Sequence, residues 1–332
     1  MFEKSLLALV SAVLMNGCTN LSIDAHSKNV DYARSVHDKA LVLDAHSDIE
    51  IPGKEDRYAG EDGLSKVEPK KMRAGGVDAV VMAIAVGPGP RNPSGYAQAR
   101  KIAEDELAAI LTITSDPSDD VVLVRSADEL DQAHKDNKRA LILGLQNARI
   151  FGTELSTIDY FYNAGVRVFA LTHMGHNDFA DSSRPIFSAA TGKHEVIEEH
   201  GGLSELGRQA IVKFNSLGAI VDVSQLSKAA TLQVISLSNQ PVIASHSNVQ
   251  SLSAVSRNLS DEEIDRIAES GGVVHVAPFR GYLFDSSDKV LDREIRAARK
   301  IANIEEDFYY PFELYWEIKD PDVQKAFLTA VS

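Results

Sequence analysis

The sequence contains little cysteine, little tryptophan and no excess of positive charge. Cys18 is the single cysteine among 332 residues, which excludes an intramolecular disulfide. The 34 lysines and arginines are outnumbered by 48 aspartates and glutamates, so the formal net charge is −14. This balance disfavours nucleic acid and anionic membrane surfaces as partners. The hydrophobic fraction of 44% is nevertheless ample for a globular core.

The N-terminal apolar stretch is too short to span a membrane but has the pattern of an export signal. Lys4 precedes the apolar residues Ser5–Met15. Leu14–Cys18 resembles a bacterial lipobox, which implies cleavage before Cys18 and lipid attachment to its sulfur; the alternative is an ordinary secretory signal. Thr19 after the cysteine implies an exported protein anchored in the outer membrane and facing the periplasm. We therefore expect a lipoprotein signal peptide at 1–18, a tether or first helix at 19–38 and a barrel domain at 39–332.

Apolar runs alternate with helix-like stretches along the rest of the chain. Residues 204–217, for example, carry Leu206, Ala210 and Phe214 on one stripe. The runs expected to be strands are 41–43, 77–86, 139–145, 166–172, 219–223, 241–244 and 272–277. Strands alternating with helices predict an α/β fold with a parallel sheet, and a glycine-rich phosphate loop of the nucleotide-binding folds is absent. Seven strands, each followed by polar residues, favour a (β/α)8-type (TIM-like) barrel with its chemistry at the strands' C-terminal ends.

Ligand-type side chains follow several of the predicted strands. His46 and Asp48 follow the first strand and, two residues apart, point to the same side of it. An imidazole and a carboxylate so placed can hold a divalent metal such as zinc. Later strands are followed by Gln146, His173, Gln225 and His246. Three histidines at matching ends of different strands favour a metal site over three structural side chains.

Several stretches resemble, in order, the membrane (renal-type) dipeptidase family of the amidohydrolase superfamily. They are Asp44-Ala-His-Ser-Asp48, the run from Gly165 to His173 with Asn177 and Ala180-Asp-Ser182, Gly202–Gly207, Leu217–Ser224, Pro241–Asn248 and Ser256-Arg-Asn258. The resemblance implies a (β/α)8 barrel with two zinc ions bridged by a glutamate and a hydroxide. It also implies hydrolysis of dipeptides and, in some members, of β-lactams or other N-acyl amino acids.

The same resemblance implies a role for each matching residue. His46 and Asp48 would hold the first zinc, and His246 would help to hold the second. His173 would polarise the scissile carbonyl and stabilise its oxyanion. Arg257 would bind the C-terminal carboxylate of the substrate, a task suited to a guanidinium fork.

The sequence departs from the family pattern at three places. Gln146 stands where the bridging glutamate is expected, and Gln225 where a histidine is expected. Because both amides are neutral, we predict at most one tightly bound zinc. No eighth strand with the catalytic aspartate is recognised before Ser332. We therefore expect open edges at 41–43 and 273–277, self-association and reduced activity.

The leading hypothesis is a lipid-anchored, zinc-dependent dipeptidase-type hydrolase whose partner is a small peptide. The alternatives are a non-catalytic relative that binds peptides and a one-metal amidohydrolase with another substrate. Either a monomer or a homo-oligomer fits the sequence, and the lipid is the only expected membrane contact. A core position is favoured for His275 and solvated loop positions for His176, His194 and His200. Asp178 and Asp181 are predicted either to bind substrate or to keep a loop soluble.

Overall fold

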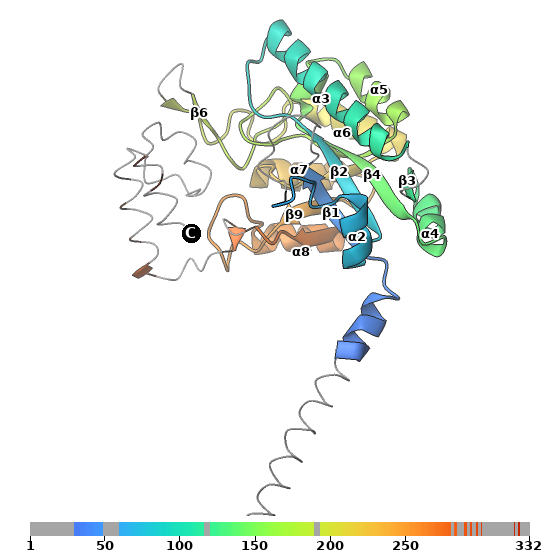
Figure 1. Ribbon diagram of the computed structural model, residues 1–332. Helices are drawn as coiled ribbons and strands as arrows, with labels where there is room; N and C mark the ends of the chain where they lie inside the picture. The colour runs from blue at the N-terminus through green and yellow to red at the C-terminus, as the bar shows by residue number, and fades with distance from the viewer. Residues whose placement is uncertain are drawn as a thin grey trace, which may run out of the picture.

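The computed structural model describes residues 30–48, 60–115, 120–188 and 193–279, together with 282–283 and isolated positions up to 325. Within these ranges a parallel sheet curls into a nearly closed barrel with helices outside it (Figure 1). Residues 30–37 are helical, whereas residues 19–29 and the signal sequence lie outside the described residues. No helix in the described ranges is long and apolar enough to cross a membrane.

The seven predicted strands are all present, although β1 shares only Leu43 with the predicted run 41–43 and continues to Asp48. Each strand pairs in parallel with the next along the barrel wall. The strands are β1 (Leu43–Asp48), β2 (Ala79–Ala85), β4 (Arg139–Gln146), β5 (Val166–Ala170), β8 (Ile220–Asp222), β9 (Ile243–Ser247) and β10 (Val273–Val276). Three short strands were not predicted: β3 (Val121–Leu123), which pairs with the start of β4, and the antiparallel pair β6 (Phe187–Ser188) and β7 (Lys193–His194). Their two or three residues are too few to show a hydrophobic period.

Helices connect the strands and cover the outside of the barrel. They are α2 (Pro69–Gly75), α3 (Pro93–Ile113), α4 (Ala127–Lys135), α5 (Ser156–Ala164), α6 (Glu205–Leu217), α7 (Lys228–Leu237) and α8 (Asp261–Glu269), with a 3-10 turn η2 (Ala148–Phe151) after β4. On α6 the predicted stripe is buried at Ala210 and Phe214, and the Phe214 ring stacks on Phe169 of β5 with centroids 4.8 Å apart. This contact anchors the helix on the wall and leaves the opposite face of β5 to the barrel interior.

Local capping signals in the sequence set most helix ends. Ser260 and Glu263 form the reciprocal capping box at the start of α8, and Gly165 ends α5 in a left-handed conformation that suits glycine. At the start of α4 only half of a capping box forms. The hydroxyl of Ser126 accepts the N–H of Glu129, but the Glu129 carboxylate accepts the N–H of Arg125 instead.

The strand path ends at β1 and β10, and in the described part of the chain no strand pairs with their outer sides. Val273 and Val276 of β10 are 51% and 70% exposed, so this edge presents apolar side chains. Both ends nevertheless curl inward. His46 of β1 stacks on His246 of β9, with ring centroids 3.8 Å apart, and this contact brings the polar ends of distant strands together.

The long loop after β5 is fixed by buried polar side chains rather than solvated. Asp181 is fully buried and accepts the backbone N–H groups of Glu199, His200 and Gly202 at 2.9 to 3.1 Å. His176 is also buried: its Nε2 donates to the Val196 carbonyl at 2.7 Å, and its Nδ1 accepts the Ser182 N–H at 3.0 Å. The expectation that His176 is solvated is therefore wrong, because backbone groups enclosed by a compact loop need internal partners.

Two further predictions for this loop are settled by its contacts. His200 is half-buried and its Nε2 donates to the Asn177 carbonyl at 2.8 Å, so it is not simply solvated. Asp181 neither faces substrate nor serves solubility, whereas Asp178 accepts the Tyr96 hydroxyl at 2.9 Å. The side chain of His194 lies outside the described residues.

We expect Asp181→Asn to lower the free energy of unfolding by about 2 kcal/mol or more, because three buried N–H groups lose their ionised acceptor. Asp178→Asn is the matched control and should change it by less than about 1 kcal/mol, since the amide still has an oxygen for the Tyr96 hydroxyl. Urea denaturation of both variants measures the difference. Equal stabilities would show that Asp181 does not hold the loop.

Candidate active site

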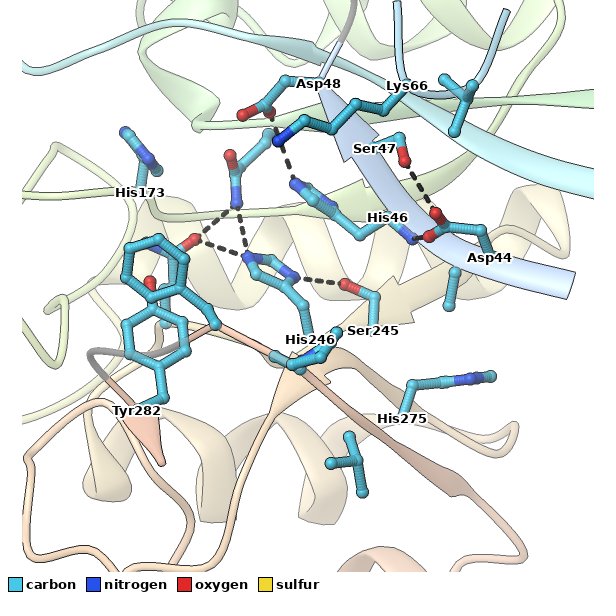
Figure 2. Close-up of a pocket in the computed structure, with 18 of the residues that line it drawn as sticks. Asp44, His46, Ser47, Asp48, Lys66, His173, Ser245, His246, His275 and Tyr282 are labelled. Atoms are coloured by element: carbon cyan, nitrogen blue, oxygen red, sulfur yellow. Dashed lines mark hydrogen bonds and ion pairs between the residues drawn. The ribbon is translucent and has the colours of Figure 1, made fainter. Parts of the chain in front are cut away.

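A cavity of about 840 Å³ opens at the C-terminal ends of the strands (Figure 2). Its lining includes His46, Asp48, Gln146, His173, Gln225 and His246 but not Arg257, Asp178 or Asp181. The six that line it come from β1, β4 and β9 and from the loops after β5 and β8. The barrel thus gathers residues that are up to 200 positions apart in the chain.

The end of β1 turns so that His46 and Asp48 meet. Asp44 accepts the His46 N–H at 3.0 Å and the Ser47 hydroxyl at 2.8 Å, and the pairing of β1 with β2 shifts register at this point. As a result the Nε2 atom of His46 lies 3.6 Å from the Oδ1 atom of Asp48. Figure 2 shows this pair at the top of the cavity, beside Lys66.

Gln146 and Gln225 are bonded to each other in the middle of the site. The carboxamide Nε2 of Gln146 lies 2.5 Å from the Oε1 of Gln225, and both groups are buried. Gln225 has a left-handed backbone, with φ of 70°, which is costly for a residue with a β-carbon. Its carbonyl accepts the Thr172 hydroxyl at 2.8 Å and the Ser183 N–H at 2.9 Å, and these bonds hold the strained conformation.

The tautomer of His246 follows from the partners of Ser245. The Ser245 Oγ lies 2.5 Å from Asp222 Oδ2 and 2.7 Å from His246 Nδ1. Because the hydroxyl gives its one hydrogen to the carboxylate, His246 must donate from Nδ1, which leaves a lone pair on Nε2.

That lone pair decides how the two amides are oriented. Gln225 Oε1 lies 3.0 Å from His246 Nε2, where a donor is required. Rotating the Gln225 carboxamide by half a turn places its N–H there. The rotation also gives partners to Gln225 Nε2, which otherwise has none in the described part of the chain, and Gln146 then accepts from it through its own oxygen. Even without the rotation an amide N–H faces this lone pair, because Gln146 Nε2 lies 3.4 Å from His246 Nε2.

His173 is held neutral by its surroundings. Burial, followed by the positive charge of Arg184, lowers the pKa of His173 from 6.5 to about 3. In the unfolded chain His173 therefore takes up a proton below about pH 6.5, whereas in the folded chain it does so only near pH 3. The contribution of neutral His173 to the free energy of unfolding is fully present above pH 6.5 and is lost as the pH falls toward 3. Burial also lowers the pKa of His246 well below its usual value, so both rings are neutral near pH 7.

Two arginines lie near the site, in different environments. Arg257, which was predicted to bind the C-terminal carboxylate of the substrate, does not line the cavity. Arg184 does line it, and this residue was not predicted because a lone arginine in a long loop carries no positional signal. His275 also lines the cavity, but Figure 2 shows its ring pointing away from His46 and His246.

The donor atoms fit one divalent ion better than two. His46 and Asp48 offer an imidazole and a carboxylate, a common zinc pair. The rings of His46 and His246 are only 18° from parallel, so lone pairs in their planes do not converge on one ion. Asp222 also lies within 4.8 Å of both histidines, but its carboxylate already accepts two backbone N–H groups and the Ser245 hydroxyl. A second ion at His246 would have to displace the Gln225 amide and would find no carboxylate bridge.

We expect the double variant Gln146→Glu, Gln225→His to raise the zinc content of the dialysed protein from at most one equivalent toward two. The change supplies an anionic bridge and a second imidazole where the wild type has neutral amides. Elemental analysis after dialysis measures the metal. Gln132→Glu, exposed on α4, adds the same negative charge at a distance and should leave the content unchanged. Two equivalents retained by the wild type would contradict the charge argument.

Comparison with known proteins identifies relatives of this chain. The family model for membrane dipeptidase (peptidase family M19) matches residues 30–306. The chain is 32% identical to dipeptidase aclJ of Aspergillus oryzae over 45% of this chain and 33% of that protein. It is 30% identical to mouse dipeptidase 3 over 48% of this chain and 31% of that protein. The aligned stretch thus spans about a third of each of these two relatives. Among solved structures, the probable dipeptidase PvdM from Pseudomonas aeruginosa aligns with a TM-score of 0.75 and 29% identity, over 92% of this chain and 78% of PvdM.

Proposed function

Because this chain belongs to the membrane dipeptidase family, peptidase family M19, we propose that it hydrolyses dipeptides or related N-acyl amino acids with one divalent metal ion, of which zinc fits best. The observation that carries this proposal is the convergence of His46, Asp48, His173 and His246 on one cavity. At about 840 Å³ that cavity is within the usual range for small-molecule sites.

Each side chain has a distinct task in this proposal. His46 and Asp48 would hold the ion, and a bound ion of this kind lowers the pKa of its water to about 7. His173 is neutral at physiological pH because burial and Arg184 lower its pKa to about 3, so it would approach the scissile carbonyl as a neutral imidazole with one N–H to donate. His246, fixed by Ser245, borders the same space and positions the amide pair.

One observation favours a second candidate, a relative that binds peptides without cleaving them. The centre of the site is occupied by Gln146 and Gln225, which are bonded to each other and to His246. Amides recognise peptide groups well but cannot accept a proton from water near neutral pH. A site of this kind retains recognition even where hydrolysis is slow.

We further propose that the chain is exported and anchored by lipid on Cys18, with a small peptide as its partner and no contact with nucleic acid. Support comes from the export signal before Cys18 and from the net charge of −14. The proposed location is the outer membrane, facing the periplasm.

Substitution of a direct metal ligand tests the hydrolytic proposal. His46→Ala should release the bound metal and reduce dipeptide turnover at least about 100-fold, because a first-row ion loses one of its two strongest ligands. His37→Ala, exposed on the N-terminal helix, is the matched control. Metal analysis and a dipeptide screen with added zinc measure the effect. Binding of dipeptides by the wild type without turnover would favour the second candidate; neither binding nor turnover would exclude both.

The anchor has its own test. Cys18→Ser should abolish incorporation of labelled palmitate in a bacterial host and should move the protein from the membrane fraction to the soluble or unprocessed one. Mass spectrometry of the wild-type mature N-terminus supplies the control. A mature terminus at any residue other than Cys18 would contradict the lipobox.

A further inference from the structure

The carboxamide of Gln146 has one side bonded within the protein and one side open to the cavity. A single atom of this carboxamide makes both of its hydrogen bonds, to Gln225 at 2.5 Å and to His246 at 3.4 Å. The other polar atom makes no hydrogen bond within the described part of the chain and is reached from the cavity that Gln146 lines. Whichever group occupies this position therefore faces a bound ligand.

The hydrogen bonds behind the carboxamide decide which of its two groups faces the cavity, because oxygen and nitrogen are assigned from such a network. Ser245 gives its hydrogen to Asp222, so His246 has a lone pair on Nε2 that requires a donor. The rotated carboxamide of Gln225 supplies this donor and also donates to Gln146, which then accepts through its oxygen. The N–H2 group of Gln146 is left on the cavity side.

This N–H2 group is held in position before a ligand binds. Gln146 ends β4 and is paired with Ala170 of β5, so its backbone belongs to the barrel wall. Its partner Gln225 is fixed in a strained conformation by the bonds that its carbonyl accepts from Thr172 and Ser183. A donor oriented in advance needs no reorganisation when charge develops on a reacting group.

The residues that surround this donor are those of the proposed reaction. Because Gln146 pairs with Ala170, which precedes His173 by three residues, neighbouring strands deliver the amide and the imidazole to the same cavity. The ring of His46 stacks at 3.8 Å on His246, the ring that Gln146 contacts at 3.4 Å. The amide is therefore close both to a proposed metal ligand and to the proposed contact of the scissile carbonyl.

We propose that Gln146 is a catalytic residue, whose N–H2 group donates a hydrogen bond to the scissile carbonyl oxygen and stabilises the negative charge that develops there. The inference rests on the proposed function for the reaction. As water adds to the carbonyl carbon, the electron pair of the C=O bond moves to its oxygen, and the N–H bonds stay intact. Gln146 and His173 then form a pair of neutral donors for this oxygen. An amide thus supplies part of the charge stabilisation that a carboxylate at this position could not.

Two analogues of Ala-Ala that resist hydrolysis separate this inference from the question of turnover. In one, a phosphinate and a methylene replace the peptide group; in the other, two methylenes replace it, so that no acceptor oxygen remains. Calorimetry gives the dissociation constant of each analogue for the wild type, for Gln146→Met, which removes the donor at similar volume, and for Gln132→Met, the same change on the exposed face of α4. Thermal unfolding and metal analysis accompany each variant.

We expect Gln146→Met to weaken binding of the phosphinate by at least about 10-fold and binding of the hydrocarbon analogue by less than about 3-fold, because only the phosphinate loses a charge-assisted bond. For Ala-Ala itself, kcat should fall about 100-fold with KM changed by less than about 3-fold, since the bond is strongest in the transition state. Gln132→Met should resemble the wild type. A crystal structure of the wild type with the phosphinate, which needs no variant, should place the Gln146 carboxamide within about 3.2 Å of a phosphinate oxygen.

Several results would overturn the proposal. They are equal weakening of both analogues by Gln146→Met, a raised KM with unchanged kcat, loss of the metal ion from this variant, and a phosphinate outside hydrogen-bond distance of Gln146. Turnover of Ala-Ala by the wild type together with any of these would retain the proposed hydrolysis. Binding of the phosphinate that depends on Gln146, without turnover of Ala-Ala, would reject hydrolysis and retain Gln146 as the donor to the ligand.

Discussion

A chain of hydrogen bonds between side chains at the ends of β4, β8 and β9 determines which groups of this site can bind a metal ion. It runs from Asp222 on β8 through Ser245 and His246 on β9 to Gln225 and then Gln146 on β4. All members of the chain are neutral side chains except the carboxylate of Asp222 at one end. The proton order along the chain is fixed because Ser245 has a single hydrogen, and this order leaves His246 with a lone pair that an amide already occupies.

The metal chemistry open to the site follows from that chain. A carboxylate bridge would neutralise part of the charge of two divalent ions, whereas two amides neutralise none of it. The carboxylate of Asp222 is close but is already bonded to Ser245 and to backbone N–H groups, so recruiting it would break the support of His246. His46 and Asp48 remain outside the chain and are the pair that can still hold an ion.

The loop after β5 both packs against the barrel wall and supplies side chains to the cavity. Asp181 and His176 satisfy its backbone from within, and this leaves His173 and Arg184 of the same loop facing the cavity. Burial, and after it the positive charge of Arg184, lowers the pKa of His173 and keeps its ring neutral. The packing of this loop therefore sets the protonation of His173 at the cavity.

The sequence by itself determined the seven strands of the barrel wall, the helix caps at Ser260 and Gly165 and the histidines that meet in the cavity, because periodicity, capping and strand order are local properties. It also determined the membership of the family, through motifs in order along the chain. Only the tertiary structure decided that Gln146 and Gln225 bond to each other, that His176 and Asp181 are buried, and that Arg184 rather than Arg257 lines the cavity. The reason is physical: burial and hydrogen-bond partners depend on which distant segments pack together, and a single arginine or amide has no period from which such packing can be read.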